Sequence, residues 1–457
     1  MKARQEHDAM GSVMVPADAY YGAQTQRARQ NFAETGLKLP GEFIRTLALL
    51  KRFAAAVNAE LKLLEPKPAQ AIMAAAQEIM DGSFEDAFVV DLFQTGSGTS
   101  TNMNMNEVIA GRANEMLTGR RGGKSPVHPN DHVNLGQSSN DVIPSVIHIA
   151  GGIGVQRKLV PALEDLRGAL AEKAEALRDI RKIGRTHLQD AVPIFLGEEF
   201  GGYARQIELG IIRVKSSVKG FRELPLGGTA VGNGLNTHPQ FAERVTQMLA
   251  SHLEMDFHPA VNHFEAQGAR DAVVALSGTL KTLAVSLSKI ANDIRWLASG
   301  PRCGIGEIHL PSLQPGSSIM PGKVNPVIPE SVLQIAAQVI GNDTAITLAG
   351  QGGVFELNAM MPVMAYNLLQ SISLLSIAAR SFSEKCIQGL RADAKKCAAY
   401  VDRSLALATY LVPKLGYDTA SAVAKKAYAK GKRIADVVLE EGLLSEEEVK
   451  ETFKEKA

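Results

Sequence analysis

The chain has 457 residues, 45% of them hydrophobic and 21% charged, which is the composition of an ordinary globular protein. A single core rarely grows beyond about 250–300 residues, so we expect two or three domains. The 49 basic and 48 acidic residues leave a formal net charge of +1, which excludes a general electrostatic attraction to nucleic acid or to anionic membranes.

The spacing of the cysteines and the polarity of the first ten residues indicate the cellular compartment of the protein. Cys303, Cys386 and Cys397 are too few and too far apart for a disulfide framework or a metal-binding CxxC pair. Segment 1–10 is polar and has no apolar core like that of a signal peptide, and no uninterrupted apolar run is long enough to cross a bilayer. We therefore expect a cytoplasmic protein with reduced thiols and no membrane contact.

In the first third of the chain, helical segments alternate with stretches rich in Gly, Pro and Asn. Segments 42–64 and 68–80 have helical patterns, whereas segment 119–131 is dense in Gly, Pro and basic residues and is predicted to be a loop. That loop contains Gly-Lys-Ser at 123–125, which nearly matches a phosphate-binding P-loop. Thr118 stands where the motif requires its first glycine and no strand pattern precedes it, so we reject that interpretation.

From about residue 140 onward, apolar residues recur every three or four positions in long series. The series run through 159–177, 200–221, 273–297 and 368–382. A mean spacing of 3.5 is typical of long helices that pack nearly parallel, at about +20°. A single bundle of this kind would expose apolar faces, so we expect bundles of several chains to pack together in an oligomer.

The tail, from about residue 391, is predicted to be a shorter helical unit. Segments 418–430, 433–442 and 445–455 read as helices, the last two short and charged. Ser445 and Glu448 have the spacing of a capping box, which marks the start of the last helix.

Four stretches of small polar residues interrupt the helical pattern. They are 94–106 (QTGSGTSTNMNMN), 128–141 (HPNDHVNLGQSSND), 184–190 (GRTHLQD) and 316–326 (GSSIMPGKVNP). Their hydroxyl, amide and backbone N–H groups are hydrogen-bond donors to anions. Each stretch alone has a plain alternative, such as a helix N-cap, a satisfied polar histidine or a flexible connection. No hydrolase, dinucleotide or metal motif occurs, so we expect no metal or organic cofactor.

The stretch 316–326 resembles the signature of the fumarase/aspartase superfamily, whose members cleave a C–O or C–N bond next to an acidic carbon and release fumarate. The resemblance extends from Met-Gly at 10–11 to Gly-Tyr-Asp at 416–418. Within the superfamily, the sequences QTGSGT at 94–99 and NMNMNE at 102–107 are most similar to class II fumarases.

The resemblance implies an all-α fold with a central bundle of long helices and smaller domains at both ends. It implies domains at 1–137 (N-terminal, mainly helical), 138–392 (central bundle) and 393–457 (small, C-terminal, helical). It further implies a homotetramer whose bundles merge into a core of 20 helices, with each active site built from three chains.

The resemblance also assigns roles that suit the chemistry of fumarate, which has two carboxylates and an electron-poor double bond. It makes Ser317 the base that takes a C–H proton, on a loop with hinges at Gly316 and Gly322. A serine hydroxyl is a weak base, so the backbone N–H groups of its loop must stabilise the alkoxide. His187, paired with Glu330, holds the water or hydroxyl at the other carbon.

The remaining implied site residues bind the carboxylates, which take neutral hydrogen bonds and one positive charge. Lys323 and Asn325 are implied at the carboxylate that gains electron density. The full set of implied substrate-binding residues is Ser97, Gly98, Thr99, Ser138, Ser139, Asn140, Thr186, Ser318, Lys323, Val324 and Asn325. A second dicarboxylate site near the entrance is implied at His128, Pro129, Asn130 and Asp131, for which a solvent loop capping a helix is an equal alternative.

The implied function is the reversible hydration of fumarate to L-malate in the tricarboxylic acid cycle, with no nucleic-acid or membrane partner. An aspartate ammonia-lyase on the same scaffold is the first alternative, because Pro-Glu at 329–330 is frequent in aspartases. A catalytically silent helical structural protein is the second, and the presence of all the implied site residues argues against it.

Overall fold

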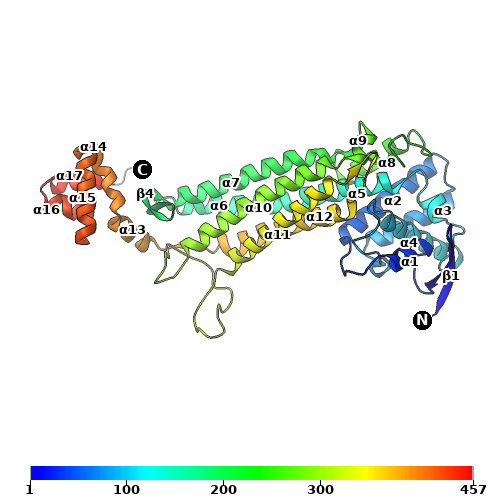
Figure 1. The fold of residues 1–457 in the computed structure, drawn as a ribbon, viewed down its shortest axis with the longest axis horizontal. Coiled ribbons are helices and arrows are strands. Elements are labelled where there is room, and N and C mark those ends of the chain that lie inside the picture. The colour runs from blue at the N-terminus through cyan, green and yellow to red at the C-terminus, as the bar shows by residue number, and fades with distance from the viewer. Residues whose placement is uncertain (1, 455–457) are drawn as a thin grey trace. The chain divides into compact units, whose positions relative to one another are not determined.

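The computed structural model describes residues 2–454 and is predominantly helical (Figure 1). The chain forms two compact units. The first comprises the residues up to Pro161, Gly210–Ala284 and Ile335–Ile377, and the second comprises Ala162–Leu209, Val285–Gln334 and the residues from Ala378 onward. Both units are discontinuous in sequence because long helices contribute residues to each. The division into 1–137, 138–392 and 393–457 stays a prediction.

The first unit begins with a β-hairpin followed by helices. Its elements are β1 (Ala3–Asp8), β2 (Gly11–Pro16), α1 (Ala23–Asn31), α2 (Gly41–Glu60), α3 (Pro66–Met80) and α4 (Thr99–Thr118). The helices predicted at 42–64 and 68–80 are confirmed as α2 and α3, which pack against each other. Leu47 and Leu50 on α2 and Ile72 on α3 are fully buried. The loop predicted at 119–131 is confirmed up to its last residues, where a single π-helical turn, Pro129–Val133, begins.

The four long apolar series are confirmed as helices. They correspond to α6 (Val160–Ala176), α7 (Leu196–Ser217), α10 (Asp271–Leu297) and α12 (Met361–Phe382), and α6 continues α5 (Ser139–Gly154) through a π-helical turn, Val155–Leu159. The α10 series has eight apolar positions, each no more than 5% exposed: Val273, Leu276, Leu280, Leu283, Leu287, Ile290, Ile294 and Leu297. The spacing of 3.5 therefore identified the buried face of the helix correctly.

One long helix, α11 (Val327–Gly350), was not predicted. Several of its buried positions are small, as at Ala336 and Ala349, so they produce no marked apolar series. Polar contacts join it to its neighbours in the first unit. Asp343 accepts hydrogen bonds from Ser277 Oγ at 2.8 Å and Lys281 Nζ at 2.6 Å on α10, and Asn342 donates to Ser371 on α12 at 3.0 Å.

Two helices in the described part of the chain are long and apolar enough to cross a membrane by length and composition alone. They are Asp271–Leu297 and Met361–Ile387, and 50% and 61% of their most apolar windows are buried inside the protein. Their apolar faces pack against other helices, which is the usual situation of core helices.

Short strands were missed by the sequence analysis, because runs of two to seven residues give little periodicity. The antiparallel hairpin of β3 (Arg181–Thr186) and β4 (Gln189–Phe195) is the longest of these. The others are β5 (Glu223–Leu224), β6 (His258–Pro259), β7 (Ile308–His309), β8 (Gly353–Val354), β9 (Leu357–Asn358) and β10 (Arg391–Ala392). Two further helices, α8 (Phe241–Leu253) and α9 (His263–Gly268), lie between β5 and α10 in sequence.

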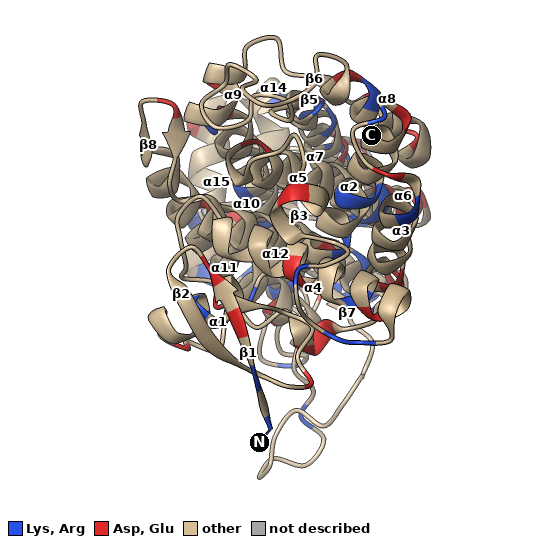
Figure 2. Ribbon diagram, turned by 90° about the vertical axis from the view of Figure 1, so that its right-hand side faces the viewer, with Lys and Arg blue, Asp and Glu red and all other residues tan. Residues whose placement is uncertain are grey.

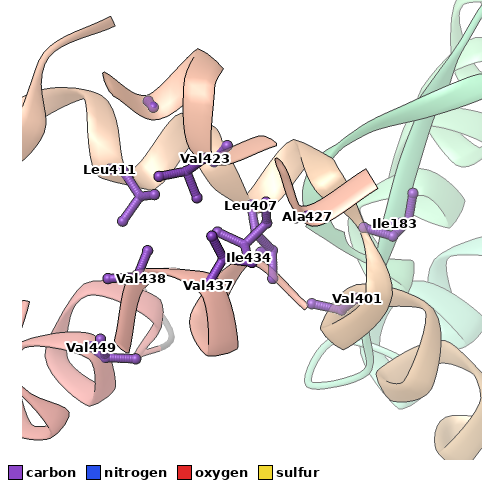
Figure 3. Packing of buried hydrophobic residues seen from close by; sticks show 12 residues of the cluster. Ile183, Val401, Leu407, Leu411, Val423, Ala427, Ile434, Val437, Val438 and Val449 are labelled. Carbon is purple, nitrogen blue, oxygen red and sulfur yellow. The ribbon is translucent and has the colours of Figure 1, made fainter. Parts of the chain in front are cut away.

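The C-terminal part of the second unit has its own apolar cluster (Figure 3). Its helices are α13 (Ala394–Arg403), α14 (Val412–Leu415), α15 (Tyr417–Lys430), α16 (Ile434–Glu440) and α17 (Glu446–Phe453). Leu411, Val423 and Val437 lie in the cluster, and Ile183 of β3 reaches it. The three predicted tail helices are confirmed as α15 to α17, and so is the capping box at Ser445; position 455 lies outside the described residues.

Charges of both signs are interspersed on the same elements (Figure 2). Strand β1, for example, carries Arg4, Glu6 and Asp8, and Arg4 pairs with Glu6 at 2.8 Å. This mixture agrees with the near-zero net charge.

All three cysteines are free, as the sequence predicted. Cys303 is exposed, whereas Cys386 and Cys397 are buried. Burial raises the pKa of both buried thiols to about 12, so they stay protonated and unreactive at neutral pH.

Candidate active site

The first donor cluster lies where the N-termini of α4 and α5 meet. Helix α4 begins at Thr99 and α5 at Ser139, and their hydroxyl oxygens are 2.6 Å apart. Ser97 Oγ lies 2.7 Å from Thr99 Oγ1, so three hydroxyls form a continuous chain. Each helix N-terminus presents the positive end of a helix dipole, and side chains cap only part of its N–H groups, as Gln94 does for Thr101 and Ser138 for Asn140. Two such ends at one point favour a bound carboxylate.

Glycines in the QTGSGT stretch make this approach possible. Gly98 caps α4 with φ of +73°, and a Cβ added there would lie 3.0 Å from Ile143 side-chain atoms. A Cβ on Gly96 would lie 1.8 Å from the carbonyl oxygen of Ala359. A side chain at Gly96 would require the backbone to move, and one at Gly98 would be strained by the positive φ and would crowd Ile143.

The other residues predicted near this cluster belong to the first turn of α5. The Ser138 hydroxyl accepts a hydrogen bond from the Asn140 N–H at 3.2 Å, and the Ser138 N–H donates to Asp141 at 2.9 Å. These bonds form a capping box. The Asn140 side chain donates to the carbonyl of Ala230 at 2.8 Å, which leaves its amide oxygen and second N–H for a ligand.

The second cluster of predicted donors comprises Thr186 and His187, and His187 lies at the tip of the β3–β4 hairpin. Thr186 pairs with Gln189, so the turn has only two residues, His187 and Leu188, with φ of 55° and 60°. Such a turn favours Asn and Gly, and a leucine with positive φ is strained. Strain of this kind is often found at functional positions. Both Thr186 and His187 are exposed at this tip.

An ion pair between Arg185 and Glu307, which the sequence did not reveal, anchors this hairpin. Arg185 donates to both carboxylate oxygens of Glu307, at 2.9 and 2.8 Å, and Glu307 is fully buried. Lys182 lies 3.3 Å from the same carboxylate. In the sequence, Arg185 stands out only as part of the GRTHLQD stretch. No motif links it to Glu307, which lies far away along the chain.

Ser317 lies in a loop closed by backbone and side-chain hydrogen bonds. The Gly316 N–H donates to the Lys323 carbonyl at 2.7 Å, and Asn325 Nδ2 donates to the Gly316 carbonyl at 2.7 Å. Ser317 Oγ accepts hydrogen bonds from the N–H groups of Ile319, at 3.3 Å, and Met320, at 3.0 Å. These two donors stabilise negative charge on the serine oxygen, as a serine base requires.

The other predicted residues of this loop are accessible. Ser318, Lys323 and Val324 are exposed, and Gly322 has φ of +81°, which suits the predicted hinge. One N–H of the Asn325 amide is used inside the loop, so the second remains for a substrate.

His187 and Glu330 form no hydrogen bond or ion pair with each other within the described chain. Among the predicted site residues, Ser97, Thr99 and Ser139 lie together in the first unit. In the second unit, Ser317 is held by backbone N–H groups of its own loop. The pairing of His187 with Glu330 stays a prediction. Residues 2–454 also contain no group of three or more His, Cys, Asp or Glu side chains that could hold a metal ion.

The predicted entrance site has a local structural role. His128 Nδ1 accepts hydrogen bonds from the N–H groups of Asn130, at 3.2 Å, and Asp131, at 3.1 Å, and so caps the turn that begins at Pro129. Burial lowers the pKa of His128 and favours its neutral form. With Nδ1 accepting, the proton is on Nε2, which can donate to an anion. A second dicarboxylate site here stays a prediction.

Comparisons with known proteins place the chain in a family. Residues 11–341 match a family model described as lyase, and residues 407–456 match one described as fumarase C C-terminus. The first match covers most of the chain, so the chain is a member of the lyase family that the helical fold and donor-rich clusters suggest.

Individual relatives narrow the assignment. A fumarate hydratase class II of Neisseria meningitidis is 52% identical over 451 residues, which cover 99% of this chain and 98% of the relative. A mitochondrial fumarate hydratase of Rhizopus oryzae is 50% identical over 98% of this chain and 91% of the relative. The crystal structure of a recombinant class II fumarase from Schistosoma mansoni superposes with a TM-score of 0.96 at 38% identity, covering 99% of this chain and 98% of that one. Within the lyases, this chain belongs to the class II fumarases.

Proposed function

We propose that this protein catalyses the reversible hydration of fumarate to L-malate, a step of the tricarboxylic acid cycle. The observation that carries the proposal is the meeting of two helix N-termini at the hydroxyl chain of Ser97, Thr99 and Ser139, with Ser317 held by two backbone N–H groups in the other unit. A dicarboxylate needs such neutral donors at one end and a base at the reacting carbon. Family membership supports the same activity.

The proposed reaction assigns each proton and electron pair. In the direction of dehydration, the Ser317 alkoxide takes a proton from the carbon next to one carboxylate, and the C–H electron pair moves into that carboxylate. Lys323 and Asn325 stabilise the resulting dianion. The pair then forms the double bond as the neighbouring C–O bond breaks. The hydroxide leaves as water with a proton from His187, and solvent restores the protonation states of Ser317 and His187.

The proposal is tested against the ammonia-lyase alternative by two substrates. We expect purified protein to produce fumarate, followed by its ultraviolet absorbance, from L-malate and not from L-aspartate. Fumarate released from aspartate at a rate comparable to that from malate would contradict the assignment, and the same assay with no product from either substrate would favour the silent structural protein.

We also propose that the protein is a homotetramer with active sites shared among three chains. Apolar side chains on the long helices support this assembly, because Ile212 on α7, Leu348 on α11 and Ile377 on α12 are 54%, 61% and 57% exposed in one chain. Exposed apolar residues on packed helices indicate contacts with further chains. The absence of a His187–Glu330 contact among the described residues of one chain agrees with a site completed by a partner.

Mixed refolding tests the shared site. We expect Thr99→Val and Ser317→Ala, each inactive alone, to regain part of the activity when the two variants are denatured together and refolded. If Thr99 and Ser317 reach a site from different chains, mixed tetramers contain some sites in which both residues are wild type. Refolding each variant by itself is the control. Reformed tetramers, of about four times the chain mass by light scattering, without recovered activity would place both residues in each site from the same chain.

The cytoplasm is the proposed compartment. The support for it is the near-neutral charge and the free thiols of the chain. One similar protein, that of Rhizopus oryzae, is described as mitochondrial.

A further inference from the structure

A buried lysine lies beneath the first donor cluster. Lys51 is fully buried on α2, and its ammonium group donates to the side-chain oxygens of Asn134 and Gln137, both at 2.9 Å. Both acceptors are neutral amides. Buried lysines are rare and normally paired with a carboxylate. Maintaining this one without a direct anionic partner is costly, so a specific role accounts for it better than packing does.

The lysine is the centre of a network that fixes the chain just before Ser138. Asn134 Oδ1 also accepts hydrogen bonds from Asn102 and Asn106, one turn apart on α4, at 3.1 Å each. Asn134 Nδ2 donates to the carbonyl of Gln137 at 3.0 Å. Three donors from α2 and α4 thus converge on one amide oxygen.

The same segment is held at further points. Gln137 Nε2 donates to the carbonyls of Val133, at 3.1 Å, and Leu135, at 3.2 Å, and Asn58 of α2 donates to the carbonyl of Leu135 at 3.0 Å. Segment 133–138 therefore has its backbone fixed immediately before α5 begins. The position of the α5 N-terminus depends on these contacts.

The lysine also supplies charge. Asp141 is fully buried in the first turn of α5 and accepts from the N–H groups of Ser138, Gly227 and Thr229 at 2.9 to 3.0 Å. Asp141 is the charged group that acts on Lys51 among the described residues of α2, α4, α5 and segment 133–138. Burial raises the pKa of Asp141, whereas the three N–H donors and the Lys51 charge favour its ionised form. Without Lys51, the ionised carboxylate would oppose a dianion bound at the α5 N-terminus.

We propose that Lys51 is a positioning residue for dicarboxylate binding. It fixes segment 133–138, and through it Ser138, Ser139 and Asn140, and it offsets the charge of Asp141 beneath the bound carboxylate. The inference rests on the proposed function in that it takes a dicarboxylate as the ligand. Burial lowers the pKa of Lys51 to about 7, so its charge changes near neutral pH.

The test compares Lys51→Met with a packing control on the same helix. The probe is succinate, a saturated dicarboxylate that does not react, and its Kd is measured by calorimetry. A hydrogen bond to a charged group typically contributes enough to change affinity by about tenfold to a hundredfold. We expect Lys51→Met to raise the Kd by at least about tenfold. Leu50→Ala, at a fully buried neighbour, should lower thermal stability and leave the Kd unchanged.

The charge gives a second readout. The succinate Kd of the wild type should rise as the pH increases through about 7, where Lys51 loses its proton, and Lys51→Met should lack this component. If Lys51→Met does not fold, Gln137→Met removes one acceptor at a half-buried position and should weaken succinate binding in the same direction.

A Kd within about twofold of wild type in folded Lys51→Met, or in Gln137→Met where only that variant folds, would overturn the proposal and leave the lysine a packing role. The proposed function is tested separately by wild-type turnover of malate. A wild type that binds succinate without turning over malate would refute the hydratase activity and leave the role of Lys51 measurable.

Discussion

Replacing Ser317 with alanine should remove most of kcat and leave dicarboxylate binding nearly unchanged. The base takes part only in the proton transfer, and a general base typically contributes about 10²–10⁴ in rate. In the proposed site the carboxylates bind to other groups, namely the hydroxyl chain of Ser97, Thr99 and Ser139 at one end and Lys323 with Asn325 at the other. The affinity for succinate should therefore stay within about twofold of wild type, because an interaction made only in the transition state lowers kcat alone.

The measurement is kcat with L-malate beside the Kd for succinate. Ser312→Ala is a matched control, because Ser312 is an exposed serine shortly before the loop and is not among the implied substrate-binding residues. We expect this control to keep most of its turnover. A Ser317→Ala enzyme within about tenfold of wild type would show that another group is the base.

Replacing His187 with asparagine should slow turnover. Asparagine keeps a polar group of similar reach but cannot act as a general acid, whereas an imidazole can. We expect a decrease in kcat of about 10²–10⁴, the usual contribution of a general acid or base. Glu330→Gln should slow turnover in the same direction, because the imidazole then lacks the charged partner that we propose for it.

The competing assignment makes His187 the base that takes the C–H proton. Under that assignment, exchange of a methylene hydrogen of L-malate with solvent deuterium would be lost in His187→Asn and retained in Ser317→Ala. The present account predicts the reverse. Comparing exchange in the two variants therefore separates the roles even if both have low kcat.

Much of the helical fold could be predicted from sequence, because buried positions in long helices repeat every 3.5 residues. The α10 series shows this most clearly, with every predicted position buried. Helix α11 could not be predicted in this way, since small residues such as Ala336 replace large apolar ones. The β3–β4 hairpin gave no signal either, because its turn uses His187 and Leu188 in place of the Asn or Gly that mark such turns.

The sequence predicts residues for the candidate site but says nothing of their geometry. Sequence motifs pointed to Ser97, Thr99 and Ser139 separately, and the 2.6 Å contact between Thr99 and Ser139 depends on how α4 and α5 pack. The support beneath the site was invisible for the same reason. The Arg185–Glu307 pair and the Lys51 network join residues far apart in sequence, and no local pattern encodes such pairs.

The most direct test of the central claim follows the atoms that are added to fumarate. Purified protein and fumarate are incubated in D₂O, and the products are followed by proton NMR. We expect L-malate with one deuterium from solvent on its methylene carbon, and equilibration from either direction. Unchanged fumarate, or conversion that requires ammonia and yields aspartate, would contradict it.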